Sequence, residues 1–364
     1  MEIAKNRTLI QVSASLNPKL GGPHSVVLAT REFLNAHFDY QLLVFGSCDI
    51  QKEDVSVIPT FKNNRYGFSL RRIQRYGVGK FRNSEILLIH GFYLYSTLIA
   101  IILFPTKNVF LMPHGSLEEY QQKKGRFRKY VFRQLLKILL RGRKIHFLLG
   151  SEPEKISILA IFPKARITVV GLGTSPIYSE LKPRDHLADP VRLFCISRIS
   201  EKKRIDLCIK ALFKLNEQRI RYTLQIIGSG DLILEEELRK LTSELGLDNQ
   251  VVFSGFLEGA KKIDAVNNAD IFLLPSENEN FAVAVAEAIS AGKPVVVSKF
   301  VAMHEFVDRH ETGITINSLE VDEIAQAIES IHHDYSKFHQ NCIDSSPLLR
   351  WQEVQKNWLR ALDV

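Results

Sequence analysis

Cysteine is scarce in this sequence, and no two cysteines are closely spaced. The 364 residues include four, at Cys48, Cys195, Cys208 and Cys342. Four scattered cysteines with no paired spacing argue against a disulfide framework or a zinc site and for a reducing compartment. The sequence also has no Asp-x-Asp pair, the usual carboxylate seat for a divalent metal that bridges a nucleotide diphosphate. We therefore expect neither a metal nor a bound cofactor.

Long apolar runs are nearly absent. The exception is residues 86–105, ILLIHGFYLYSTLIAIILFP, whose length approaches that of a membrane span. His90 and Gly91 interrupt this run, which favours a buried strand followed by a core helix. The first fifteen residues have no apolar core ahead of a small-residue cleavage site. We expect no secretory signal and a cytoplasmic protein.

Acidic residues are few in the first half of the chain. Residues 1–182 hold 27 Lys and Arg against 12 Asp and Glu, whereas the remainder holds 21 against 28. This asymmetry predicts that only the first half faces a polyanion, either a membrane surface or nucleic acid. Nucleic acid is disfavoured because the sequence has no aromatic-basic interleaving and no known reading motif.

Strand-like and helix-like segments alternate along the whole chain, which is the pattern of α/β proteins with parallel sheets. The length predicts two domains. Residues 175–190 carry three prolines and no clear hydrophobic period, so they make the best linker. We expect a basic N-terminal domain at residues 1–182, a C-terminal domain at residues 190–346, and a terminal helix at residues 347–364 that crosses back to the first domain.

Residues 123–144, KKGRFRKYVFRQLLKILLRGRK, have helical periodicity on two faces. Phe127, Val131, Leu135 and Ile138 form an apolar stripe, and Lys129, Arg133, Lys137 and Arg141 form a parallel basic one. One interpretation is a helix packed on the sheet with a solvated charged face. The other is a peripheral membrane element held by anionic lipid. Because the first half carries a large positive charge, we give these two interpretations about equal weight.

Two glutamates stand in the most informative stretch, residues 275–298, PSENENFAVAVAEAISAGKPVVVS. We expect a strand at residues 270–274, a helix from about residue 281 to 291 that Gly292 and Pro294 end, and a strand at residues 294–297. Glu279 then lies in the loop before the helix, and Glu287 about two turns into it. The first amides of the helix, at Phe281, Ala282 and Val283, offer an anion site between them.

Basic residues at a neighbouring strand end complete a candidate binding site. Arg198 and Lys203 follow the strand expected at residues 191–197, and Gly228 begins the turn after the strand at residues 222–227. Two cations and a helix N-terminus can hold a diphosphate without a metal. The alternative is a plain Rossmann-like domain with surface charges.

The first half offers two weaker signals. Gly21 and Gly22 precede a helix expected at residues 25–37, where glycine lets a phosphate or sugar approach the backbone closely. Most glycine pairs are simply turns. His90 and His114 each stand at the carboxyl end of an expected strand, beside a glycine, where chemistry is usually done. A lone histidine is more often structural.

Together these residues resemble the retaining glycosyltransferases of family 4, which have the GT-B fold. Glu279 and Glu287 fit that family's E-x7-E motif, and Arg198 and Lys203, in RISEKK, fit its diphosphate-binding pair. IIGSGD fits the family's glycine turn, and VVFSGFLEG fits the strand before the site. The resemblance extends over residues 191–318 and is thinner earlier, in LGGPHS, LLIHGF and PHGSLEEY.

The resemblance implies two facing Rossmann-like domains that move a hexose-type sugar from a UDP- or GDP-sugar to a saccharide or lipid-linked acceptor. Cell-surface polysaccharide, lipopolysaccharide or glycolipid synthesis is the expected setting, at the cytoplasmic membrane face. By this analogy Arg198 and Lys203 stabilise the leaving diphosphate and Glu287 holds the ribose. Glu279 and the backbone from Asn280 to Val283 hold the donor sugar, which His114 contacts from the first domain. Gly22 lies near the phosphates.

One departure from the family pattern is Ala282, which stands where glycine usually follows the phenylalanine. Its methyl group would either narrow the sugar pocket or require an ordinary negative φ. A different GT-B enzyme such as a nucleotide-sugar epimerase, or an inactive GT-B binding or scaffold protein, stays open as an alternative.

Overall fold

The computed structural model describes residues 7–17, 22–46, 48, 52–58, 81, 83–122, 125–174, 187–216 and 220–362. The chain divides into unit 1, Met1–Gly171 with Gln355–Val364, and unit 2, Leu172–Val354. Most of the expected linker, residues 175–186, lies outside the described residues. The last part of the chain, from Gln355, joins unit 1.

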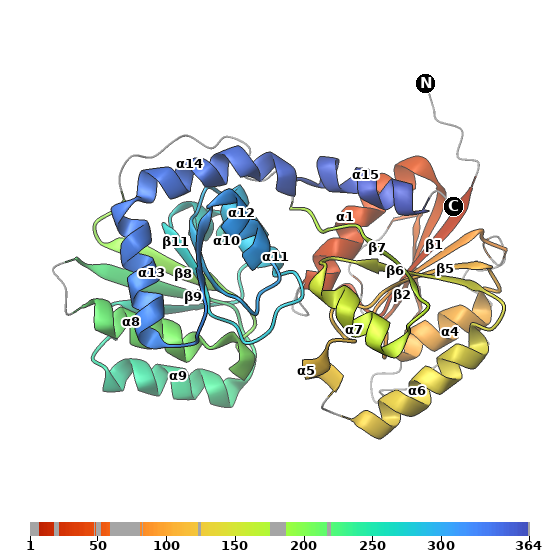
Figure 1. Cartoon of the computed structure of the whole chain (residues 1–364), viewed down its shortest axis with the longest axis horizontal. Coiled ribbons are helices and arrows are strands. Elements are labelled where there is room, and N and C mark those ends of the chain that lie inside the picture. The colour runs from red at the N-terminus through yellow and green to blue at the C-terminus, as the bar shows by residue number, and fades with distance from the viewer. Residues whose placement is uncertain are drawn as a thin grey trace. The chain divides into compact units, whose positions relative to one another are not determined.

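Unit 1 is built on a seven-stranded parallel sheet with the order β3-β2-β1-β4-β5-β6-β7. Helices lie on both faces of this sheet (Figure 1), so its central strands are continuous apolar runs rather than alternating ones. The elements are β1 (Thr8–Ser13), α1 (Gly22–His37), β2 (Asp39–Phe45), β3 (Val55–Ile58), β4 (Ile86–His90), α4 (Tyr95–Leu103), β5 (Asn108–Met112), α5 (Glu119–Gln122), α6 (Arg126–Leu139), β6 (Lys144–Leu149), α7 (Pro153–Ile161), β7 (Arg166–Val169) and, at the end of the chain, α15 (Trp351–Leu362).

Unit 2 is a six-stranded parallel sheet with the order β10-β9-β8-β11-β12-β13. Its elements are β8 (Val191–Ile196), η2 (Glu201–Lys203), α8 (Ile205–Leu215), β9 (Tyr222–Ile227), α9 (Leu232–Glu244), β10 (Val251–Gly255), α10 (Gly259–Asn267), β11 (Ile271–Leu274), α11 (Val283–Ser290), β12 (Val295–Ser298), α12 (His304–His310), β13 (Gly313–Ile316), α13 (Val321–His333), α14 (Tyr335–Ser345) and η3 (Ser346–Leu349).

Each face of the unit 2 sheet has its own apolar core. One core joins the strands to α8, α9 and α13, and the other joins them to α10, α11, α12 and α14. Burial on both faces explains why β11 and β12 read as IFLL and VVVS with no polar alternation. Two Rossmann-like units with parallel sheets confirm the predicted α/β architecture.

The apolar run at residues 86–105 forms a strand and a helix, as predicted. Ile86–His90 is the fully buried β4, and Tyr95–Leu103 is α4, with Ile99, Ala100 and Ile101 in the core. Across the described part of the chain, no helix combines the length and the apolar character that crossing a membrane requires.

The orientation of α6 contradicts the interpretation in which its apolar stripe packs on the sheet. Phe127 and Ile138 are 79% and 68% exposed, and Val131 and Leu135 are exposed as well, while Leu136 alone in this helix is buried. The basic stripe partly faces the body of the unit. Arg133 donates to the Tyr93 hydroxyl and to Gln122 Oε1, at 3.1 and 3.0 Å. The apolar stripe, which this interpretation placed against the sheet, is therefore exposed to solvent. Residues 123 and 124 lie outside the described residues.

Candidate nucleotide-sugar site

The sheet of unit 2 reverses its strand order between β8 and β11. From β8 the chain adds β9 and β10 on one side, then crosses to β11, β12 and β13 on the other. In open parallel sheets, ligands bind at the carboxyl ends of the strands at such a switch point. Arg198 lies two residues past β8, and Glu279 lies five residues past the adjacent strand β11. The topology thus brings the two predicted segments to one sheet edge.

Glu279 is held between two lysines. Its Oε1 lies 2.7 Å from Lys203 Nζ and 3.0 Å from Lys202 Nζ, and it accepts a hydrogen bond from Ser276 Oγ at 3.3 Å. The Lys203 and Glu279 side chains are 12% and 14% exposed. Electrostatic interactions between side chains buried to this extent are stronger than in water. Two cations on one carboxylate leave surplus positive charge at this sheet edge.

The pKa shifts of this cluster follow from burial and from the unequal numbers of charges. Burial lowers the pKa of Lys203, Glu279 offsets this in part, and Lys202 and Arg198 lower it further. Burial works to raise the pKa of Glu279, but the charges of Lys203 and Lys202 outweigh it, so this pKa is lowered. Glu279 is therefore ionised, and an added anion would relieve the repulsion among the cations.

Backbone hydrogen bonds fix the Glu279 loop from both sides. The N–H of Glu277 donates to the Lys202 carbonyl at 2.8 Å, and Lys202 Nζ donates to the Asn278 carbonyl at 3.1 Å. The Glu279 N–H donates to the Phe300 carbonyl, and its own carbonyl accepts from Ala302, both at 3.0 Å. The carboxylate is thus positioned in advance of any ligand. Lys202 and Lys203 both hold this carboxylate, although the sequence predicted only Arg198 and Lys203.

Glycine is required where the turn after β9 packs against the exit of β8. Gly228 has φ +142°, and a Cβ there would lie 1.8 Å from the Ser197 carbonyl oxygen; one on Gly230 would lie 2.1 Å from that of Ile199. These two carbonyls flank Arg198. The Gly228 N–H donates to the Gly255 carbonyl at 2.7 Å. Gly228 therefore allows the turn to pack closely against the exit of β8, and its own N–H is already hydrogen-bonded to Gly255.

Ala282 adopts a left-handed conformation, which rules out the alternative in which its methyl group imposes an ordinary negative φ. It precedes the first residue of α11 with φ 64° and ψ 68°. For an alanine this conformation costs about 1–2 kcal/mol. Phe281 and Ala282 are partly buried against the core that includes α11. They and Asn280 join Glu279 to the helix start at Val283. The helix runs from Val283 to Ser290, two residues shorter at its start than expected.

Glu287 lies on the second turn of α11 and has a lysine partner from α10. Lys262 Nζ lies 2.7 Å from both Glu287 carboxylate oxygens. A carboxylate so held keeps lone pairs for further donors, such as sugar hydroxyls. Lys262 was not predicted, because no spacing in the sequence relates α10 to α11.

The candidate residues of unit 1 lie at the switch point of its own sheet or close to it. That sheet reverses between β1 and β4. Gly22 is the first residue of α1, which follows β1; Gly21 lies outside the described residues. His114 follows β5 with φ 52°, and its Nε2 lies 2.9 Å from His90 Nδ1. Burial lowers the pKa of His114 to about 4, so the ring is neutral at pH 7.

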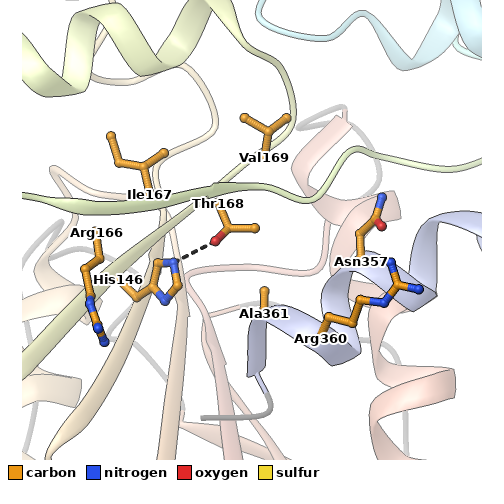
Figure 2. Close-up of a pocket in the computed structure, with 8 residues that line it drawn as sticks. All are labelled: His146, Arg166, Ile167, Thr168, Val169, Asn357, Arg360 and Ala361. Carbon is orange, nitrogen blue, oxygen red and sulfur yellow. Dashed lines mark hydrogen bonds between the residues drawn. The ribbon is translucent and has the colours of Figure 1, made fainter.

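A separate hollow lies beside β6 and β7, the last two strands of the unit 1 sheet, and none of the predicted residues lines it. Its volume is about 680 Å³, and it lies between β6, β7 and α15 (Figure 2). It is lined by His146, Arg166, Ile167, Thr168, Val169, Asn357, Arg360 and Ala361. Among the described residues, no group of three or more His, Cys, Asp or Glu side chains could hold a metal ion.

Replacing Ala282 with glycine should stabilise the protein, because glycine adopts a positive φ without steric cost. We expect the free energy of unfolding to rise by about 0.5–1 kcal/mol in Ala282→Gly, measured by urea denaturation. Ala288→Gly, inside the same helix, is the matched control and should lower it by about 1 kcal/mol or more. A loss of stability in both variants would contradict the strain assigned to Ala282.

Comparisons with known proteins agree with this architecture. The sequence model of the family described as glycosyl transferases group 1 matches residues 180–347. The chain is 33% identical over 157 residues to the amylovoran biosynthesis glycosyltransferase AmsK of Erwinia amylovora, covering 42% of this chain and 38% of AmsK. It is 27% identical over 160 residues to a GDP-mannose-dependent phosphatidylinositol monomannoside mannosyltransferase of Mycobacterium tuberculosis, covering 42% of this chain and 41% of that one. The matched stretches thus span about two fifths of these relatives.

Similarity of structure extends over nearly the whole chain. The crystal structure of HepE from Anabaena, in complex with UDP and glucose, superposes with a TM-score of 0.75 at 18% identity, covering 98% of this chain and 99% of HepE. Likeness at this identity establishes the fold alone. The chain has the GT-B fold, and its residues 180–347 match the glycosyl transferases group 1.

Proposed function

We propose that the protein is a retaining glycosyltransferase. It moves a hexose-type sugar from a UDP- or GDP-sugar to a saccharide or lipid-linked acceptor, without a metal, in the synthesis of a cell-surface polysaccharide, lipopolysaccharide or glycolipid. The observation that carries the proposal is the surplus of positive charge at the β8–β11 switch point. There Lys202 and Lys203 share one carboxylate oxygen of Glu279, with Arg198 beside them.

The surplus charge fits the leaving group of a nucleotide-sugar. As the bond from the anomeric carbon to the diphosphate breaks, negative charge grows on the diphosphate oxygen. Fixed cations in a site of low dielectric stabilise this charge without rearranging. Arg198 and Lys203 have this role, and Lys202 keeps Glu279 in place. The partial positive charge at the start of α11, at Val283, supports the same anion.

The carboxylates and unit 1 supply the remaining roles. Glu279, with the backbone of Asn280, Phe281 and Ala282, holds hydroxyls of the donor sugar. Glu287, oriented by Lys262, accepts hydrogen bonds from the ribose. His114 donates to the donor sugar, and Gly22 lies near the phosphates.

The acceptor attacks from the same face of the sugar that the diphosphate leaves. A new bond forms between the acceptor oxygen and the anomeric carbon, and the acceptor proton passes to the departing phosphate oxygen. This sequence retains the anomeric configuration.

The outer face of α6 supports an acceptor at the cytoplasmic face of a membrane. Its exposed Phe127, Tyr130, Val131, Leu135 and Ile138 are accompanied by exposed Arg126, Arg128, Lys137 and Arg141. An apolar stripe rimmed with arginine and lysine is typical of helices that lie in the headgroup layer. Each basic residue near an anionic surface contributes on the order of 1 kcal/mol. We infer that α6 docks unit 1 on anionic lipid.

Substituting the proposed diphosphate cations should abolish most turnover. We expect Arg198→Ala and Lys203→Ala to lower the rate of nucleotide release in the presence of acceptor by about a hundredfold or more, because the leaving group loses a fixed charge. Lys210→Ala, which removes a half-exposed lysine paired with Asp206, should retain wild-type turnover. Substantial turnover in either cation variant would refute the assigned roles.

The same assay separates the alternatives. Nucleotide release from donor alone, with no dependence on acceptor, would favour an epimerase. The absence of nucleotide-sugar binding to the wild type would favour a scaffold protein.

Membrane docking is tested by flotation with vesicles. We expect the wild type to float with anionic vesicles more than with neutral ones, and the double variant Phe127→Ser/Ile138→Ser to lose this binding because its apolar contacts are removed. Leu232→Ser, which changes a 74% exposed leucine on α9 in unit 2, is the matched control. Equal partitioning of the wild type to both kinds of vesicle would overturn the inference.

A further inference from the structure

Five polar side chains from five segments of unit 1 form one continuous buried hydrogen-bond network. They are Tyr40 of β2, Gln11 of β1, Thr30 of α1, His90 of β4 and His114 after β5. Tyr40, Gln11, Thr30 and His90 are each at most 4% exposed, and His114 is partly exposed at the end of the network. Buried polar groups at this density cost free energy unless every donor meets an acceptor. The direction of each bond is therefore constrained.

The constraint begins at the backbone of α1. Thr30 Oγ1 lies 2.8 Å from the Val26 carbonyl, which can only accept, so the hydroxyl donates there. Thr30 Oγ1 must then accept from Gln11, 2.8 Å away, and the facing atom of Gln11 is its amide nitrogen. The Gln11 amide oxygen accepts from the Tyr40 hydroxyl. Burial and the charge of Asp54 raise the pKa of Tyr40, which keeps that hydroxyl protonated.

The direction continues through both histidines. The second hydrogen of the Gln11 amide points at His90 Nε2, 2.7 Å away, so this nitrogen accepts and the His90 proton is on Nδ1. His90 Nδ1 then donates to His114 Nε2 at 2.9 Å. His114 Nε2 accepts, so its proton is on Nδ1. Among the residues that the structure describes, none accepts a hydrogen bond from His114 Nδ1.

Further contacts surround the two histidine rings. The planes of His90 and His114 lie within 23° of each other with centroids 5.2 Å apart, and the His90 ring lies 6.4 Å from that of Trp358 of α15. The Trp358 indole donates to the Gly171 carbonyl at 3.1 Å. The loop of His114 is fixed where the Gly115 N–H donates to the buried Glu154 carboxylate at 2.7 Å. A left-handed histidine held from several sides is strain of the kind found at functional sites.

We propose that Gln11 and His90 are positioning residues that fix His114 as a neutral Nδ1–H donor, whose acceptor is an oxygen of the bound ligand. His114 then donates a hydrogen bond and cannot take a proton at Nε2, which His90 occupies. The inference rests on the proposed function only for the identity of that ligand, a hydroxyl of the donor sugar. The relay itself is a property of the free protein.

Nitrogen NMR of histidine-labelled protein tests the relay directly. At pH 7 we expect both His90 and His114 to be neutral with the proton on Nδ1. His114→Asn and His90→Phe supply the assignments. An Nε2–H tautomer or an imidazolium at His114 in the wild type would overturn the proposal, whether or not the protein transfers sugar.

A variant then separates positioning from mere support. His90→Phe keeps an aromatic ring against Trp358 but removes the donor to His114, so we expect the Nε2–H tautomer of His114 to become populated. Turnover should fall about tenfold, the usual effect of one hydrogen bond. Tyr40→Phe removes a bond that does not set the direction of the relay, so it should leave the His114 tautomer unchanged. An unchanged tautomer in His90→Phe would overturn the relay. A changed tautomer with wild-type turnover would overturn its part in the reaction while leaving the proposed function intact.

Discussion

The contact of Glu279 with Lys202 and Lys203 is the interaction on which the site in unit 2 depends. It joins the segments that follow β8 and β11, where the sheet reverses its strand order. Burying a carboxylate is tolerable when partners compensate the lost hydration, and here two lysines do so. Because the cations outnumber the carboxylate, the cluster also has the charge that an anionic ligand completes. The same three side chains thus join the two strand ends and leave a surplus of positive charge there.

Unit 1 uses buried polarity in a different way. Its network contains no ion pair, and its order comes from the fixed direction of each hydrogen bond from Thr30 through Gln11 and His90 to His114. Burial lowers the pKa of both His90 and His114, so charge is excluded there. One unit therefore offers fixed positive charge and the other a neutral donor.

The sequence predicted those features that follow from strand ends and local periodicity. Parallel strands end at one sheet edge, so residues just past β8 and β11 could be brought together by topology alone. The parts that were missed depend on packing between segments without a common period. Lys262 reaches Glu287 from another helix, and Gln11 reaches His90 from another strand. The direction of the α6 stripe was wrong in one interpretation because periodicity identifies a face without saying which way it points. The left-handed Ala282 goes against intrinsic preference, which no local pattern predicts.

Titration calorimetry of UDP and GDP against the free protein tests the central claim, that the switch point of unit 2 is a diphosphate site. Uridine, UMP and their guanine counterparts serve as controls. One nucleoside diphosphate should bind at least tenfold more tightly than its monophosphate, and Arg198→Ala should remove most of that difference because it removes a charge that we propose stabilises the second phosphate. Equal affinities for mono- and diphosphate, or a preference that persists unchanged in Arg198→Ala, would contradict the account.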